Sequence, residues 1–304
     1  MFDVVIVGSG PAGLGAAIYA KRAMLDAVVI EKAGYSGGQI INTDDVDNYL
    51  GLSGISGYDM AMSFREHADK LDVLFKDVEV TNIAEETGGY RLSTSGGDDI
   101  LTKTVILATG ANHSKLNVTG EDKYTGKGVS YCATCDGAFY RGKEVAVIGG
   151  GDVALEDALY LSKIASKVYL VHRRDELRGA KSLQDKVFAA DNIEFVKDTV
   201  VEAINGEIKV TDIDVLNVKS KEACKIKVDG VFIAVGMKPN TEFVNGFVDM
   251  DEKGYIKALE DGITSRAGIF VAGDARTKNL RQVITAVADG ANCVASVEKY
   301  LNLL

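Results

Sequence analysis

Short runs of apolar residues recur along the chain, and each ends at a glycine or at a polar residue. Residues 4–7 form the first run, and residues 27–30 form the second. Short continuous apolar runs are typical of parallel strands that are buried on both faces. Residues 11–21 lie between them and predict a helix. The pattern therefore predicts a strand–helix–strand unit at the start of the chain.

The same unit recurs in the middle of the chain, where residues 145–148 and 168–171 predict two strands with a helix between them. The spacing repeats without a gap. The first glycines that follow the first strands are 141 positions apart, and so are the residues that end the second strands, Glu31 and His172. Two copies of one mononucleotide-binding unit are therefore predicted.

Three further apolar runs complete the two units: residues 105–110, 231–236 and 269–274. The third run is far from the first unit in sequence, so we expect the first domain to resume after the second has been inserted. The final stretch, residues 283–301, is apolar at helical spacing but carries Asp289 and Glu298. It predicts a packed helix and not a membrane anchor.

These elements predict an α/β fold with two Rossmann-like three-layer dinucleotide-binding domains, one inserted into the other. We assign residues 1–114 and 242–304 to the discontinuous domain and residues 115–241 to the inserted domain. The short connections near 112–117 and 238–243 are the expected hinges.

The composition excludes several classes of function. The 304 residues are 46% hydrophobic and 26% charged, which is ordinary for a globular protein. A net charge of −10 argues against a nucleic-acid partner, because a phosphate binder needs a basic face. No membrane span or signal peptide is expected, since the apolar start has no basic segment before it. Four cysteines do not make a secreted disulfide framework, so the expected location is the cytoplasm.

Two glycine-rich turns follow the first strand of each unit. The first turn reads Gly8-Ser9-Gly10-Pro11-Ala12-Gly13, and the second reads Gly149-Gly150-Gly151-Asp152-Val153-Ala154. Such glycines let the backbone approach a pyrophosphate at a helix N-terminus. Glu31, which ends the next strand, can accept a hydrogen bond from a ribose hydroxyl. Together these features predict an adenine dinucleotide at the first turn.

At the position that contacts the ribose, the second unit has a different type of residue from the first. His172 is followed by Arg173 and Arg174, and Arg178 comes four residues later. Arginines bind phosphate through charged hydrogen bonds, whereas Glu31 of the first unit would repel a 2′-phosphate. A solvated basic face is the alternative interpretation. The position at the end of a Rossmann strand favours 2′-phosphate binding, so we expect NADPH at this unit.

Between the two signatures lies the stretch Val129-Ser-Tyr-Cys-Ala-Thr-Cys-Asp136. Two cysteines in a CxxC spacing, Cys132 and Cys135, can close an easily reduced disulfide. A zinc half-site and an inert structural pair are the alternatives. Cys224 and Cys293 are isolated and the three histidines are scattered, so no metal site is predicted, and both isolated cysteines are expected to be small buried hydrophobes.

Asp136 follows the pair directly and could carry a proton for it. The alternative is that Asp136 only caps a helix that begins after the cysteines. The residues alone leave both interpretations open.

The ordered motifs resemble the low-molecular-weight, bacterial-type thioredoxin reductases, which are class II pyridine nucleotide-disulfide oxidoreductases. The resemblance extends from Phe2 to about Val294 and rests on GSGPAG, GGQI, ATG, CATCDG, GGGDVALEDA, HRRDELR, GMKPNT, AGD and RQVITAVADG. It implies a homodimeric flavoprotein whose FAD domain is interrupted by an NADPH domain that carries the redox disulfide. Val153 and Gly179 depart from the family pattern, in which Ser or Thr and Ala are common at these positions.

The resemblance also implies roles for individual residues. FAD is expected at Gly8, Ser9, Gly10, Pro11, Ala12, Gly13, Glu31, Gly38, Gln39, Asn48, Val80, Thr109, Gly110, Gly273, Asp274, Arg281, Gln282 and Val283. NADPH is expected at Gly149, Gly151, Asp152, Ala154, His172, Arg173, Arg174 and Arg178. Cys135 is implied as the thiol that faces the flavin, Cys132 as the thiol that exchanges with thioredoxin, and Asp136 as the acid/base.

The expected function is hydride transfer from NADPH to FAD, reduction of the Cys132–Cys135 disulfide, and exchange with oxidised thioredoxin. Three alternatives stay in view. The chain could serve another protein, such as a peroxidase or a glutaredoxin-like carrier; it could take electrons from ferredoxin; or it could be a non-catalytic, redox-sensing flavoprotein. The intact nucleotide motifs argue against the last two.

Overall fold

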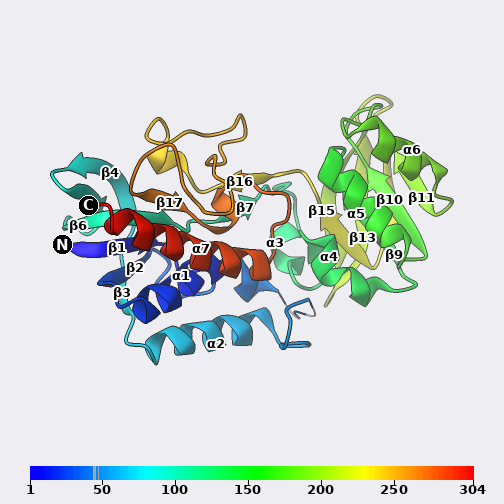
Figure 1. The fold of residues 1–304 in the computed structure, drawn as a ribbon. Coiled ribbons are helices and arrows are strands. Elements are labelled where there is room, and N and C mark those ends of the chain that lie inside the picture. The colour runs from blue at the N-terminus through cyan, green and yellow to red at the C-terminus, as the bar shows by residue number, and fades with distance from the viewer. Residues whose placement is uncertain (44–45, 47) are drawn as a thin grey trace. The chain divides into compact units, whose positions relative to one another are not determined.

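The computed structural model describes all of the 304 residues except residues 44, 45 and 47. It divides into two compact units, Met1–Asn112 with Lys238–Leu304, and His113–Met237. The boundaries expected from the sequence lie a few residues further along the chain. The first unit is thus formed from both ends of the chain, with the second inserted between them (Figure 1).

A seven-stranded sheet forms the centre of the first unit, in the order β3-β2-β1-β6-β5-β4, with β17 paired to β6. Its strands are β1 (Phe2–Val7), β2 (Ala27–Glu31), β3 (Leu74–Asp77), β4 (Val80–Glu86), β5 (Gly89–Thr94), β6 (Asp99–Leu107) and β17 (Ile269–Val271). The pairs among β1, β2, β3, β6 and β17 are parallel, and β4 and β5 extend the sheet in antiparallel fashion. Because β17 pairs with β6, the C-terminal part of the chain contributes a strand to the sheet of the first unit.

Alternate residues of β1 point into two different cores. Val4 and Ile6 pack with the helices α1 (Pro11–Arg22) and α7 (Val283–Leu301), whereas Val5 and Val7 pack on the side of β4 and β5. In Figure 1, α7 lies alongside α1. Glycine permits this close approach, because a Cβ at Gly290 would lie 2.2 Å from the carbonyl oxygen of Ala12.

The second unit repeats the plan with a five-stranded parallel sheet in the order β11-β10-β9-β15-β8. Its strands are β8 (Val129–Ser130), β9 (Glu144–Ile148), β10 (Lys167–Val171), β11 (Ile193–Val196) and β15 (Gly230–Ile233). Helices α5 (Asp152–Ser162) and α6 (Lys181–Ala189) pack on one face. The other face packs against an antiparallel sheet of β12 (Thr199–Gly206), β13 (Val210–Asn217) and β14 (Ala223–Lys227).

The prediction of an α/β fold with two Rossmann-like three-layer domains is confirmed. The sequence did not reveal that a separate antiparallel sheet of β12, β13 and β14 covers the second face of the inserted unit's parallel sheet. Helix α2 (Gly57–Asp69) also belongs to the first unit. The remaining elements are short: α3 (Glu121–Tyr124), α4 (Ala133–Asp136), β7 (Ala111–His113), β16 (Met237–Pro239), η1 (Gly38–Asn42), η2 (Gly137–Tyr140), η3 (Glu242–Val244) and η4 (Gly273–Ala275). The chain passes between the units at β7 and β16, which pair with each other.

Helix α7 is the packed helix that the sequence predicted, with buried positions along its length. Among the described residues, no helix is both long enough and apolar enough to cross a membrane.

Helix α5 carries a carboxyl group that should make stability depend on pH. Burial, together with the smaller effect of the neighbouring Glu156 charge, raises the pKa of Asp157 to about 7. A group whose folded pKa lies above its unfolded value stabilises the fold at low pH, and this contribution is lost as the pH rises through the folded pKa. We therefore expect the free energy of unfolding to fall by about 2–4 kcal/mol between pH 5 and pH 8 because of this residue.

Denaturant unfolding of the Asp157→Asn variant across this pH range checks the expectation. The variant should lose most of the decline and be the more stable protein at pH 8. Asp191→Asn, which replaces an exposed acid of the same unit, should behave like the wild type. A decline that is as steep in Asp157→Asn as in the wild type would rule out Asp157 as its source.

Candidate functional site

The two cysteines of the CxxC stretch form a disulfide, Cys132–Cys135. Cys132 is the N-cap of the short helix α4, and Cys135 lies within the helix. The backbone N–H groups of Cys135 and Asp136 donate to the carbonyl oxygen of Cys132 at 3.2 and 3.1 Å, which closes the turn around the pair. Both cysteines are partly exposed. A disulfide on a single turn, reachable from solvent, suits thiol–disulfide exchange.

Asp136 is connected to the first cysteine through a hydroxyl group. Ser130 Oγ donates to Asp136 Oδ2 at 2.5 Å and accepts from the N–H of Cys132 at 3.1 Å. The helix starts at Ala133, so Asp136 lies in its last turn, and its side chain does not cap the following helix η2. The interpretation of Asp136 as a simple helix cap is therefore wrong.

Sequence reasoning missed Ser130. The only signal was its place two residues before Cys132 in the same stretch.

The two other cysteines have different surroundings. Cys293 is buried in α7, as expected, and its Sγ donates to the carbonyl oxygen of Val271 at 3.3 Å. Cys224 is exposed, so the prediction that it is buried is wrong. It lies on β14, the edge strand of the three-stranded sheet, where a side chain has a neighbouring strand on one side only. The described part of the chain contains no group of three or more His, Cys, Asp or Glu that could hold a metal ion.

The first glycine turn joins β1 to α1 and leaves the start of the helix open. Gly10 is the N-cap without a side-chain cap, and Pro11 takes the first helical position. A Cβ at Gly10 would meet only the Cα of Gly38, at 3.9 Å. Two glycine backbones thus face each other beside uncapped N–H groups, an arrangement that accommodates a phosphate.

The acid at the end of β2 is fixed next to this turn. Glu31 Oε2 accepts from the N–H of Ser9 at 2.9 Å and from Ser9 Oγ at 2.8 Å, and Oε1 accepts from the N–H of Ala33 at 2.9 Å. Each carboxylate oxygen can accept two hydrogen bonds. Oε1 therefore keeps the capacity to accept a ribose hydroxyl, as predicted for Glu31.

Two glycines of the turn should respond differently to alanine. A Cβ at Gly8 would lie 2.4 Å from the carbonyl oxygen of Ala108, and its φ is +107°. Gly8→Ala should therefore lower the free energy of unfolding by about 2 kcal/mol or more. Gly10→Ala has room in the fold, so it should keep near-native stability but weaken FAD binding by filling the space beside the helix start. Thermal unfolding and flavin titration of the two variants separate these outcomes, and equal stability losses would contradict the expectation.

Several buried polar atoms of the first unit lack a hydrogen-bond partner among the described residues. These atoms are Thr109 Oγ1, Asp274 Oδ1 and Arg281 Nε. Buried polar groups are nearly always satisfied in folded proteins, so three orphans within the predicted flavin set fit a polar cofactor. Burial raises the pKa of Asp274, while the charges of Lys278 and Arg281 act in the opposite direction.

The other predicted flavin residues of this unit occupy defined places. The side-chain amide of Gln39 donates to the carbonyl oxygen of Ala111, and Asn48 Nδ2 donates to Gln282 Oε1 at 2.9 Å. Gln282 is the N-cap of α7 and Val283 is its first residue. The structure thereby joins Asn48 and Gln282, although 234 positions separate them. Val80 is buried in β4, and Gly110 and Gly273 both have a positive φ.

The second glycine turn joins β9 to α5 in the same way. Gly151 is an N-cap without a side-chain cap, and a Cβ there would meet nothing within 4 Å. Asp152 Oδ1 accepts from the N–H of Ala180 at 2.7 Å, so this predicted nucleotide residue also holds a neighbouring loop. Ala154 is fully buried in α5. The turn offers an open helix start for a second pyrophosphate.

The arginine cluster is exposed, and Asp175 within the same stretch pairs with Lys219 and not with an arginine. Arg173, Arg174 and Arg178 are exposed, and none of them forms an ion pair within the described ranges. The N–H of Arg178 donates to the carbonyl oxygen of Gly150 at 2.7 Å, which brings the loop back to the glycine turn. Three cations without partners beside a nucleotide turn suit a 2′-phosphate.

His172 is buried against this turn. A Cβ at Gly150 would lie 2.5 Å from the His172 ring, and His172 Nε2 has no partner among the described residues. Burial lowers the pKa of His172, and the three arginines lower it further. We therefore expect a neutral imidazole at neutral pH, which leaves the positive charge to the arginines.

The structure also shows the surroundings of Val153 and Gly179, which depart from the family pattern. Val153 is exposed in the first turn of α5. A Cβ at Gly179 would lie 2.5 Å from Leu155 Cδ1, so an alanine here would require Leu155 to move.

The profile of the pyridine nucleotide-disulphide oxidoreductase family matches residues 2–290. The chain belongs to this family. Its members use flavin and nicotinamide cofactors, in agreement with two glycine turns and a disulfide in one chain.

Individual relatives extend over the full length. The thioredoxin reductases of Listeria innocua and Bacillus subtilis are each 40% identical over 305 aligned residues, which cover all of this chain and 95% and 96% of the relatives. The crystal structure of thioredoxin reductase from Streptococcus pyogenes has a TM-score of 0.95 at 45% identity, covering 100% of this chain and 99% of that one.

Proposed function

We propose that the chain is a thioredoxin reductase that uses FAD and NADPH. The observation that carries the proposal is the partly exposed Cys132–Cys135 disulfide in the same unit as the arginine cluster. Full-length likeness to proteins named thioredoxin reductase supports it. Unpaired arginines at the second turn favour NADPH over NADH, and they give no reason to prefer a ferredoxin donor.

The residues present fit both cofactors. FAD would be held at the first glycine turn, Glu31 and the orphaned atoms of Thr109, Asp274 and Arg281. NADPH would be held at the second turn and at the arginine cluster. When bound, these cofactors would supply a hydride equivalent, which is two electrons and one proton, and a second proton from solvent would complete the conversion of the Cys132–Cys135 disulfide to a dithiol.

The chain's own residues then carry out the exchange. The Cys132 thiolate attacks one sulfur of the thioredoxin disulfide, a new S–S bond forms, and the second thioredoxin sulfur leaves as a thiolate. Cys135 attacks Cys132 in this mixed disulfide, which restores Cys132–Cys135 and releases reduced thioredoxin. Asp136 would take a proton from the cysteine pair and return it to the leaving thiolate, with Ser130 holding the carboxyl group in place.

Steady-state oxidation of NADPH by the FAD-loaded protein tests the proposal. Oxidised thioredoxin from the same cell should accelerate the anaerobic reaction by orders of magnitude over the background without a protein substrate. If thioredoxin has no effect but a peroxidase or a glutaredoxin-like carrier does, the chain is a sibling disulfide reductase. A homodimer and a cytoplasmic location stay predictions, which gel filtration and cell fractionation can test.

A further inference from the structure

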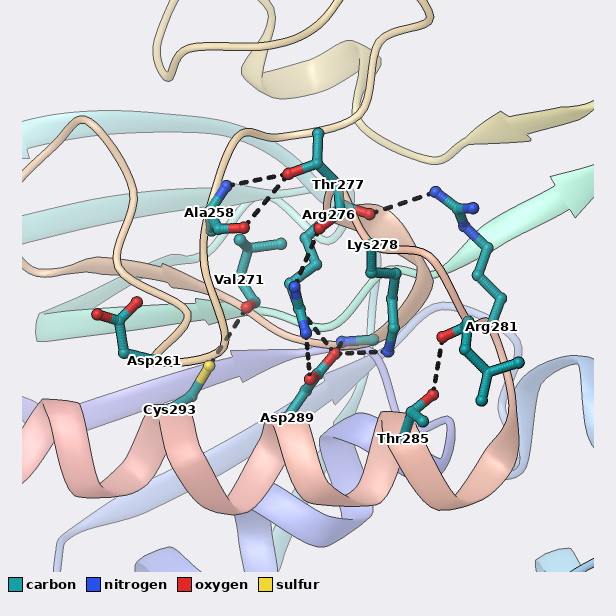
Figure 2. Close-up of polar contacts among 12 residues, drawn as sticks. Ala258, Asp261, Val271, Arg276, Thr277, Lys278, Arg281, Thr285, Asp289 and Cys293 are labelled. Carbon is teal, nitrogen blue, oxygen red and sulfur yellow. Dashed lines mark hydrogen bonds and ion pairs between the residues drawn. The ribbon is translucent and has the colours of Figure 1, made fainter. Parts of the chain in front are cut away.

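A buried polar cluster of Asp289, Arg276 and Lys278 lies beneath the Gly273–Asp274 turn, and the sequence predicted no role in the site for any of these three residues. Asp289 Oδ1 accepts from Arg276 Nη2 at 2.7 Å. Asp289 Oδ2 accepts from Arg276 Nε at 2.9 Å, from Lys278 Nζ at 2.8 Å and from the N–H of Gly273 at 2.9 Å. Figure 2 shows the Arg276 and Lys278 side chains converging on Asp289 above helix α7. The Asp289 carboxylate of α7 thus accepts four hydrogen bonds from the loop at 273–278.

The charges within this cluster do not balance. The side chains of Asp289, Arg276 and Lys278 are only 6%, 8% and 5% exposed, and two cations share one carboxylate. Burial alone would raise the pKa of Asp289, but Arg276 and Lys278 hold it below its usual value. The cluster therefore carries a buried positive charge, which is costly unless another anion lies nearby.

Asp274 supplies such an anion. Its Oδ1 is buried without a partner in the part of the chain that the structure describes. Burial raises the pKa of Asp274, and Lys278 is the group that opposes this most strongly. Asp289 fixes Lys278 and also fixes the N–H of Gly273, the residue next to Asp274.

The turn itself is tightly constrained. Gly273 has a φ of +75°, and a Cβ there would lie 2.8 Å from the Cβ of Ala12 in α1. The backbone at 273 therefore has little freedom on the side of α1, and Asp289 holds its N–H from the side of α7.

We propose that Asp289 is a positioning residue of the flavin site: it fixes the Gly273 peptide and the Lys278 ammonium group around Asp274. The Asp274 carboxylate is then presented, with its charge balanced, as an acceptor for hydroxyl groups of the polyol chain of FAD. This inference rests on the proposed binding of FAD to the first unit.

The test compares FAD with ADP as ligands of the apoprotein. ADP contains the part of FAD that the glycine turn and Glu31 would bind, but it lacks the polyol chain. In Asp289→Asn the Kd for FAD should rise at least about tenfold, because charged hydrogen bonds to the turn are lost. The Kd for ADP should stay within about twofold of wild type, since its contacts are retained. A merely structural role of Asp289 would weaken both ligands together.

Two further variants keep the inference testable if Asp289→Asn folds poorly. Lys278→Met retains the Arg276–Asp289 pair and should still weaken FAD selectively. Asp274→Asn should weaken FAD as well, and the double variant Asp274→Asn/Asp289→Asn should be no weaker than Asp274→Asn alone, because both residues act through one group.

Three results would each overturn the inference. Asp289→Asn could weaken ADP and FAD equally, the losses of FAD affinity could be fully additive in the double variant, or Lys278→Met could leave FAD affinity unchanged. A wild-type apoprotein that binds no FAD would instead overturn the proposed function.

Discussion

Replacing Cys132 with serine should reduce thioredoxin-dependent turnover by about a thousandfold or more, because the attacking thiolate is lost. Cys132 is the N-cap residue of α4 and is partly exposed, so the substitution should leave the fold intact. The measurement is the rate of thioredoxin reduction by the FAD-loaded variant under anaerobic conditions.

Cys135→Ser makes the matched comparison. It should be equally inactive in turnover, but its free Cys132 thiol should trap thioredoxin as a mixed disulfide that is visible on a non-reducing gel. If Cys135→Ser traps nothing and Cys132→Ser does, the two cysteines have exchanged roles. As a further control, Cys224→Ser replaces an exposed cysteine and should retain wild-type activity.

Removal of the arginine cluster is expected to have the second large effect. In the triple variant Arg173→Ala/Arg174→Ala/Arg178→Ala, the KM for NADPH should rise by about a hundredfold or more, because each charged hydrogen bond to a phosphate is worth about 1.5–3 kcal/mol. The KM for NADH, which has no 2′-phosphate, should change by less than about threefold. Steady-state kinetics with both nucleotides provides the comparison.

Lys209→Ala serves as the control, since it removes a cation of the same unit that lies outside the cluster. Its preference for NADPH should equal that of the wild type. If the triple variant loses NADPH and NADH to the same extent, the arginines do not read the 2′-phosphate, and a solvated basic face becomes the correct interpretation.

The strand–helix–strand units could be predicted because their signals are local. Strand β1, the glycine turn and α1 follow one another within residues 2–22, and each has a distinctive composition. The same holds for β9, its glycine turn and α5. Local patterns were therefore sufficient to predict the two glycine turns and the redox-active cysteine pair.

Contacts that depend on distant pairing could not be predicted. Ser130 reaches Asp136 from the end of β8, a strand of two residues whose place is fixed by pairing with Val231 and Phe232 of β15. Nothing close to Ser130 in the sequence indicates this partner strand. The exposure of Cys224 likewise depends on which strand is the edge of its sheet.

The role of Asp289 illustrates a different limit. An acid in an apolar helical stretch correctly indicated a packed helix and not a membrane span. Its partners Arg276 and Lys278 precede the helix in a loop, and only tertiary packing brings their side chains to the carboxylate. A buried acid predicts that partners exist, because an unpaired buried charge is costly, but it does not identify them.

The most direct test of the proposed function is a count of thiols after addition of NADPH. The FAD-loaded protein is treated anaerobically with NADPH, alkylated and mapped by mass spectrometry. Two new alkylated sites are expected, at Cys132 and Cys135, and both should disappear again when oxidised thioredoxin is added before alkylation. A flavin that is bleached by NADPH while the Cys132–Cys135 disulfide stays oxidised would contradict the proposal.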